Sequence, residues 1–200
     1  MTQAHTIASY IVSLNEAFDA RADFERSKAK DDSSNIHKTL AKLRKNVTRE
    51  SVASFFMSHN IDAALINRAI RADSRINVYA YEKIENVASA ALKSEALNHY
   101  SVAILKSALS LEGVDSALTF EDAKAACSAD SKLKDNKRDK LIKRYSRIVA
   151  SGTASTQSSS SLEALCAFDV LKRSRNSEGD TVFIVNHEND VAKALIERVA

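Results

Sequence analysis

The chain contains no proline and only three glycines among its 200 residues. Folds with many tight turns recruit these two residues, because glycine reaches positive φ angles and proline presets a turn. Their scarcity argues against an all-β fold and against the glycine-rich phosphate loops of nucleotide-binding α/β folds. Alanine, serine, lysine and arginine are abundant instead, and they suit helices joined by short polar turns. We therefore expect a mostly α-helical protein.

Composition and cysteine use indicate the compartment. Hydrophobic residues make up 44% of the chain and charged residues 28%, which is typical of a folded globular protein. Cys127 and Cys166 are too few for a disulfide framework and fit a reducing environment. No apolar run approaches the roughly 20 residues that cross a bilayer, and the N-terminal segment lacks the basic start of a signal peptide. The sequence predicts a cytoplasmic protein with no membrane partner.

Residues 1–96 are predicted to form a helical bundle. From Ile7 to Phe18, apolar residues recur at three- and four-residue steps, the spacing of one helix face, whereas residues 21–35 read as a frayed end and a loop. Further helices are expected over residues 36–45, 48–57, 61–70 and 78–94. Thr48 and Asn77 are the expected caps, because their side chains can accept from the free amides of a first turn.

The order of elements over residues 48–94 has a second interpretation. A short helix, a tight turn, another short helix and a long helix are also the outline of a helix-turn-helix. Many unrelated helical bundles share this outline, so both interpretations stay open.

Residues 97–200 are predicted to form a second part that begins with two helices. The first spans roughly Leu97–Leu111 and ends before Gly113, where a left-handed residue is expected. Thr119 caps the second helix, over residues 120–128. The stretch 131–150 holds eight lysines and arginines against two aspartates, and apolar spacing predicts a basic helix over residues 138–149.

The pattern changes near the C-terminal end of the sequence. Residues 182–185 are β-branched or aromatic, which is the strongest strand signal in the chain. We expect residues 181–185 to pair with residues 170–174 as one small β-hairpin, with Gly179 in its turn. A final helix follows from Asn186 or Asn189.

The order of elements over residues 100–187 resembles a winged helix-turn-helix domain. Residues 119–128 (TFEDAKAACS) match its supporting helix, residues 155–168 (STQSSSSLEALCAF) its recognition helix, and residues 169–185 its wing. The resemblance implies binding of double-stranded DNA. A charged stretch of about twenty residues replaces the family's short turn between the two helices. Either the basic helix 138–149 or the helix that begins near Ser158 would read the DNA.

The candidate contacts to nucleic acid fall into three groups. Cations of the charged stretch would neutralise phosphates, hydroxyl and amide groups at a helix start would bind phosphate oxygens, and cations lie along the wing. Gln157 could also bond an adenine edge in the major groove. The groups are Lys137, Arg138, Lys140, Lys143, Arg144 and Arg147; Thr153, Ser155, Thr156, Gln157 and Ser158; and Lys172, Arg173 and Arg175.

The sequence carries no strong sign of catalysis. The five histidines are scattered without metal-ligand spacing. Glu121, Asp122 and Lys124 have the spacing of some metal-dependent nucleases, but acidic residues are expected at a helix start in any case. We predict that the protein is not an enzyme and needs no cofactor or metal.

The expected function is non-enzymatic DNA binding, by a regulator or by an accessory to replication, packaging or partition. Two alternatives remain, because a formal net charge of +3 does not by itself indicate nucleic acid. The chain could be a helical adaptor, scaffold or inhibitor whose basic helix meets an acidic protein surface. It could also bind RNA, with Tyr79, Tyr81 and Tyr145 available for base stacking.

Overall fold

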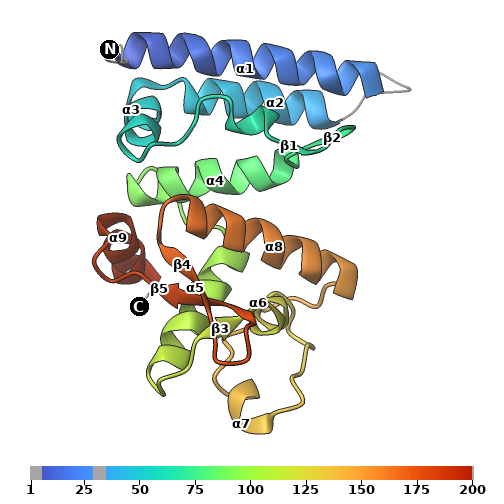
Figure 1. The fold of residues 1–200 in the computed structure, drawn as a ribbon, viewed down its shortest axis with the longest axis vertical. Coiled ribbons are helices and arrows are strands. Elements are labelled where there is room, and N and C mark those ends of the chain that lie inside the picture. The colour runs from blue at the N-terminus through green and yellow to red at the C-terminus, as the bar shows by residue number, and fades with distance from the viewer. Residues whose placement is uncertain (1–5, 29–34, 200) are drawn as a thin grey trace. The chain divides into compact units, whose positions relative to one another are not determined.

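A computed structural model describes residues 6–28 and 35–199 and confirms the mostly helical fold expected from the sequence (Figure 1). Within these residues there are nine α-helices, one short 3₁₀ helix and two small antiparallel sheets. None of the helices in this part of the chain is long and apolar enough to cross a membrane. The chain divides into two compact units, Met1–Ala88 and Ser89–Ala200.

Helices make up most of the first unit. They are α1 (Ile7–Lys28), α2 (Asn35–Val47), α3 (Glu50–Ser58) and most of α4 (Val78–Ala91). The rings of Phe18 and Phe56 meet the ring of Tyr81 edge-on, with centroid distances of 5.7 and 6.4 Å, and all three side chains are buried. Aromatic edge contacts of this kind stabilise a core. Because Tyr81 is fully buried, its ring is not accessible for stacking on an RNA base.

Helix α1 continues through the segment that was expected to fray. The side chain of Arg21 is buried, and its guanidinium donates to the Glu25 carboxylate at 2.7 Å and to the Ile66 carbonyl at 2.5 Å. Arg21 therefore takes an inward position that aliphatic residues take elsewhere on the helix. A pattern that counts only apolar residues misses this turn.

The expected helix over residues 61–70 is wrong. The chain forms a single 3₁₀ turn, η1 (Leu65–Asn67), and then a short hairpin of β1 (Ala69–Arg71) and β2 (Ser74–Arg75). The polar groups of this segment bind α1, since Asn67 donates its side-chain amide to the Ala17 carbonyl at 2.7 Å. Ile70, in β1, is 59% exposed. The helix-turn-helix interpretation of residues 48–94 is therefore wrong as well.

The two caps expected in the first unit have opposite outcomes. The side-chain oxygen of Asn77 accepts from the amide of Tyr79 at 2.8 Å, so Asn77 does cap α4. Thr48 does not cap α3, because its hydroxyl donates back to the Arg44 carbonyl at 2.7 Å and the helix begins after Arg49. Helix α4 ends at Ala91, three residues before the expected end, and Leu92 beyond it is exposed.

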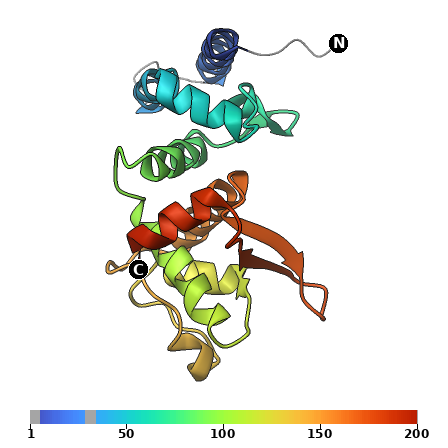
Figure 2. The ribbon, with the colours of Figure 1, turned by 90° about the vertical axis from the view of Figure 1, so that its left-hand side faces the viewer.

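The second unit packs helices against a small sheet (Figures 1 and 2). Its helices are α5 (His99–Glu112), α6 (Phe120–Ala126), α7 (Asn136–Asp139), α8 (Ser151–Ala167) and α9 (Asp190–Val199). Its strands are β3 (Leu118–Thr119), β4 (Leu171–Arg175) and β5 (Thr181–Val185). Helices α5, α6 and α8 contact one another, and the buried side chains of Leu105, Ala123 and Leu165 lie in this core.

The predicted C-terminal hairpin is confirmed, with one addition. Strands β4 and β5 pair antiparallel from Leu171 opposite Val185 to Arg175 opposite Thr181, one residue beyond the expected partner range. Gly179 lies in the turn with a φ of 86°, which favours glycine. The sequence did not predict β3, which pairs with β5 and completes the strand order β3-β5-β4. Figure 2 shows the hairpin projecting from the helices of this unit.

The end of α5 and the start of α6 were predicted with different success. Gly113 follows α5 with an ordinary φ of −60°, and Asp115 takes the left-handed conformation instead, with a φ of 53°. Thr119 caps α6 as expected: its hydroxyl accepts from the Asp122 amide at 3.2 Å, while the Asp122 carboxylate accepts from the Thr119 amide at 2.7 Å. This reciprocal capping box fixes the start of α6.

Replacing Thr119 by alanine is expected to lower the free energy of unfolding by about 1 kcal/mol, because a first-turn amide loses its acceptor. Urea denaturation followed by circular dichroism measures the change. Thr156→Ala, at an exposed site inside α8, is the control and should change stability by less than about 0.5 kcal/mol. Equal stability of the wild type and Thr119→Ala would show that the capping box contributes nothing.

Candidate nucleic-acid interface

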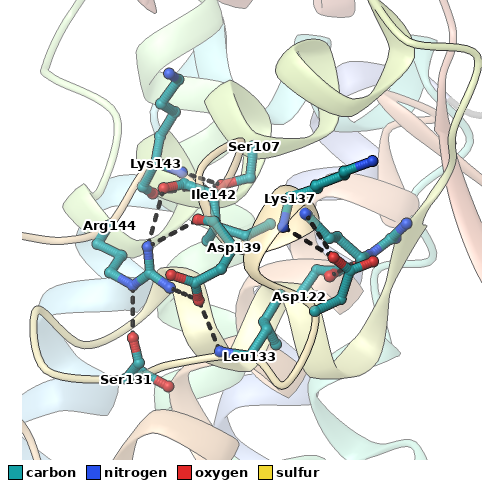
Figure 3. A network of polar contacts seen from close by, with 11 residues as sticks. Ser107, Asp122, Ser131, Leu133, Lys137, Asp139, Ile142, Lys143 and Arg144 are labelled. Atoms are coloured by element: carbon teal, nitrogen blue, oxygen red, sulfur yellow. Dashed lines mark hydrogen bonds and ion pairs between the residues drawn. The ribbon is translucent and has the colours of Figure 1, made fainter.

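The charged stretch between α6 and α8 is a loop, and the basic helix predicted over residues 138–149 is wrong. Residues 127–150 contain one short helix, α7, and α8 begins at Ser151, so Gly152 lies inside a helix instead of ending one. Two arginines of the stretch turn inward toward carboxylates and carbonyls, as Figure 3 shows for Arg144. These contacts hold the backbone away from a helical path.

Arg138 fastens the loop to α6 and to the segment before it. Its Nε donates to one carboxylate oxygen of Asp122 at 2.7 Å, and its Nη2 binds the other oxygen. Two further bonds reach the Ser116 hydroxyl at 2.8 Å and the Ala117 carbonyl at 2.7 Å. The Asp122 carboxylate is 1% exposed, and its hydrogen bond raises the pKa of the Arg138 guanidinium. Arg138 is therefore occupied in the fold and is not a free phosphate contact.

Arg144 closes a second network, which Figure 3 shows from nearby. Its guanidinium binds the Asp139 carboxylate and donates to the Ser131 carbonyl at 2.7 Å. The same carboxylate accepts from the Leu133 amide at 2.6 Å, and this bond lowers the pKa of Asp139. The loop is joined to α5 where the Ser107 hydroxyl accepts from the Lys143 amide at 2.9 Å.

The other four cations of the predicted basic group remain exposed. They are Lys137, Lys140, Lys143 and Arg147. In the described part of the chain, none of the four side chains forms an ion pair. The structure thus separates two structural arginines from four cations that are open to a phosphate.

The serine-rich segment is helical, and α8 starts earlier than the predicted recognition helix. Leu162, Leu165 and Phe168 are buried. Ser158 was expected to project outward but is fully buried, and its hydroxyl donates to the Ser155 carbonyl at 2.9 Å. Small side chains on this face let α8 approach α5 and α6 closely.

The predicted contacts at the start of α8 are thus divided between two faces. Thr153 and Thr156 are exposed, whereas Ser155 and Gln157 are half-buried. The side-chain oxygen of Gln157 is itself buried, which turns this group away from the surface. Sequence reasoning passed over Ser159, which is exposed.

One outward row of α8 reaches the hairpin. Thr156, Ser159 and Glu163 follow one another at three- and four-residue steps, so they lie on one face of the helix; we call them the α8 row. The Glu163 carboxylate binds the Arg173 guanidinium of β4 at 2.7 Å. This ion pair joins the α8 row and the basic strand into one surface.

The basic strand carries the three cations predicted for the wing. Lys172, Arg173 and Arg175 are all exposed. Side chains alternate along a strand, so Arg175 shares the face of Arg173 and Lys172 lies on the other. Arg175 donates to the Gly179 carbonyl at 2.6 Å, which holds it over the turn.

The start of α8 is open to an anion. No side chain caps the helix at Ala150, and its first turn contains no acidic residue. Amides of an uncapped first turn point outward and attract negative charge. The exposed Arg147 precedes this turn in the chain. This helix start therefore adds to the positive character of the surface.

A second basic feature lies between α5 and the loop, and sequence reasoning missed it. His99, Lys106, Lys143, Tyr145 and Arg147 line a hollow of about 400 Å³ together with apolar side chains of α5. Lys143 and Arg147 were predicted contacts, but Lys106 and His99 belong to a helix far from them in sequence. A local sequence pattern does not predict a contact between residues of separate elements.

The cysteines and metal-binding side chains show no comparable arrangement. Cys127 is buried, and burial raises the pKa of Cys166 to about 11, so this thiol stays protonated at neutral pH. Within residues 6–28 and 35–199, no three histidine, cysteine, aspartate or glutamate side chains are grouped to hold a metal ion.

Comparisons of the chain with protein-family models, with curated proteins and with solved structures gave no match.

Proposed function

We propose that the protein binds double-stranded DNA without catalysing a reaction, through the α8 row and the basic strand β4. The observation that carries this proposal is the ion pair between Glu163 and Arg173. It places Thr156 and Ser159 of α8 on the same surface as Arg173 and Arg175 of β4, with the Glu163 carboxylate between them. Polar side chains can meet base edges in a groove while cations bind the flanking phosphates.

The order of elements supports the same proposal. In the second unit, α5, β3, α6, α8 and the β4–β5 hairpin follow one another, and β3 pairs with the far strand of the hairpin. This order resembles a winged helix-turn-helix domain, with α6 as the supporting helix, α8 as the recognition helix and the hairpin as the wing. The loop 127–150 takes the place of the short turn, and α6 still packs against α8. Because a fold alone does not give a function, the surface chemistry has to supply it.

The geometry supports a narrower set of contacts than the sequence suggested. Because residues 140–149 are not helical and α7 ends at Asp139, α8 is the proposed recognition helix. Thr156 and Ser159 take the outward place that the sequence gave to Gln157 and Ser158. Arg173 and Arg175 would bind phosphates beside the α8 row, and Lys172 would bind one from the other face of β4. Phosphate contacts add affinity with little sequence preference.

The first test is a titration of the whole protein against a labelled duplex at two salt concentrations. Affinity should fall steeply with salt, because bound phosphates release counterions. Unlabelled duplex of unrelated sequence should compete, while RNA of the same length should compete less. No binding of the duplex at low salt, or binding that salt does not weaken, would contradict the proposal.

Replacing Thr156 by aspartate is expected to weaken duplex binding by about tenfold or more, because it places a negative charge against phosphates. The matched control is Ser51→Asp, an equally exposed site in α3 of the first unit. Fluorescence anisotropy measures both affinities, and melting curves check that both variants are folded. Equal affinity of the two variants for the duplex would show that α8 is not part of the interface.

A further inference from the structure

The hollow between α5 and the loop carries positive charge on several sides. Lys106 enters from α5, and Lys143 and Arg147 enter from the loop. Arg144 also lines the hollow, but its charge is paired with Asp139. No aspartate or glutamate is among the described residues that line it. Three cations without carboxylate partners around one hollow attract a multiply charged anion.

Two rings form a flat wall at the same place. The His99 ring stacks on the Tyr145 ring with a centroid distance of 5.7 Å and an angle of 22° between their planes. Tyr145 also contacts the ring of Tyr100, the next residue of α5, with a centroid distance of 4.8 Å. His99 is exposed and lines the hollow. Flat aromatic groups of this kind stack on nucleobases with little sequence preference.

The loop holds this arrangement in place. The amide of Tyr145 donates to the Ala126 carbonyl at 2.7 Å, and the amide of Lys143 donates to the Ser107 hydroxyl at 2.9 Å. The lining side chains therefore project from an anchored backbone. A hollow of about 400 Å³ falls within the usual range of small-molecule sites, about 300–1,000 Å³.

We propose that this hollow binds one nucleotide unit, with its phosphate among Lys106, Lys143 and Arg147 and its base against the ring of His99. Charge defines the phosphate position, and the stacked rings define the base position. The unit could be a free mononucleotide or the phosphorylated end of a strand, since both present the same chemistry. The site does not depend on the α8 row or on β4, so it stands apart from the proposed duplex contact.

Isothermal titration calorimetry of the whole protein tests the site with four probes. They are adenosine monophosphate, adenosine, inorganic phosphate and a short single-stranded oligonucleotide with a 5′-phosphate. We expect the monophosphate to bind more tightly than adenosine or phosphate alone, because only it presents both groups. Tighter binding of the oligonucleotide than of the monophosphate assigns the site to strand ends, and the reverse order assigns it to free nucleotides. No binding of either overturns the proposal.

Two sets of variants locate the binding. Lys106→Gln combined with Arg147→Gln should weaken binding of the monophosphate by about tenfold or more, since two charge-assisted contacts are lost. Lys137→Gln combined with Lys140→Gln is the matched control, because both lysines are exposed in the same stretch and neither lines the hollow. His99→Ala should weaken binding of the monophosphate but not binding of inorganic phosphate. Binding that the double variant of Lys106 and Arg147 leaves unchanged contradicts the assigned site.

A third variant separates this proposal from duplex binding. Thr156→Asp should weaken binding of the duplex and leave binding of the monophosphate unchanged. If the wild type binds the monophosphate but not the duplex, the proposed function fails and the nucleotide site stands. If the wild type binds the duplex but not the monophosphate, the proposed nucleotide site is wrong and the proposed function stands.

Discussion

Replacing Arg138 by alanine is expected to lower the free energy of unfolding by about 3 kcal/mol, because it leaves the buried carboxylate of Asp122 without its cation. The Asp122 side chain is 1% exposed and binds both Arg138 and the amide of Thr119. The variant also removes donors from the Ser116 hydroxyl and the Ala117 carbonyl. Urea denaturation measures the change.

Arg147→Ala is the control for this variant, since Arg147 lies in the same loop but is exposed and has no described ion pair. It should change stability by no more than about 0.5 kcal/mol. If the two variants unfold alike, Arg138 does not hold the loop. A large difference would mean that lost DNA binding in an Arg138 variant reports damage to the fold and not a lost phosphate contact.

Replacing Lys172, Arg173 and Arg175 together by glutamine is expected to weaken duplex binding by about one hundredfold at low salt, because three phosphate contacts are lost. The slope of log affinity against log salt concentration should fall by about 3, at roughly one unit for each contact. Titrations on two unrelated duplexes should show the same loss. Melting curves should change little, because all three side chains are exposed.

A matched triple variant in the first unit tests whether position or charge number matters. Lys38, Lys42 and Lys45 are exposed on α2, and their replacement by glutamine removes the same charge. The proposed interface requires this control to bind duplex almost as well as the wild type. Equal losses in both triple variants would mean that general charge attraction, and not the β4 surface, binds the duplex.

Local sequence patterns predicted the elements whose contacts are themselves local. The caps of Asn77 and Thr119 and the strand over residues 181–185 depend on neighbours within a few residues or on side-chain shape. The third strand was missed because β3 is two residues long, and no alternation can be recognised in so short a segment.

The loop shows where local patterns fail. The apolar spacing over residues 138–149 is helical, yet only Ile142 is well buried and Ile148 is 71% exposed. The backbone follows the partners of Arg138 and Arg144 instead, and Asp122 lies in another helix. Pairing with a distant carboxylate outweighs helix propensity, which contributes only a fraction of a kcal/mol per residue.

Part of the candidate site could have been predicted more accurately from the sequence. Ser158 lies four residues before Leu162 and seven before Leu165, so helical spacing already places it on their buried face. The same spacing places Thr156 and Ser159 on the exposed face of the helix. The ion pair of Glu163 with Arg173 and the entry of Lys106 into the hollow had no such signal, because they join separate elements.

The strand order of the second unit sets when this unit can fold during synthesis. Leu118 and Thr119 have their partners in β5, and Glu112 meets the ring of His187 at 2.7 Å. Arg198, in α9, donates to the carbonyl of Ala90. The ribosome must therefore release β5 and α9 before the earlier helices of this unit are covered. Until then the apolar surfaces of those earlier helices are open to chaperones and to aggregation.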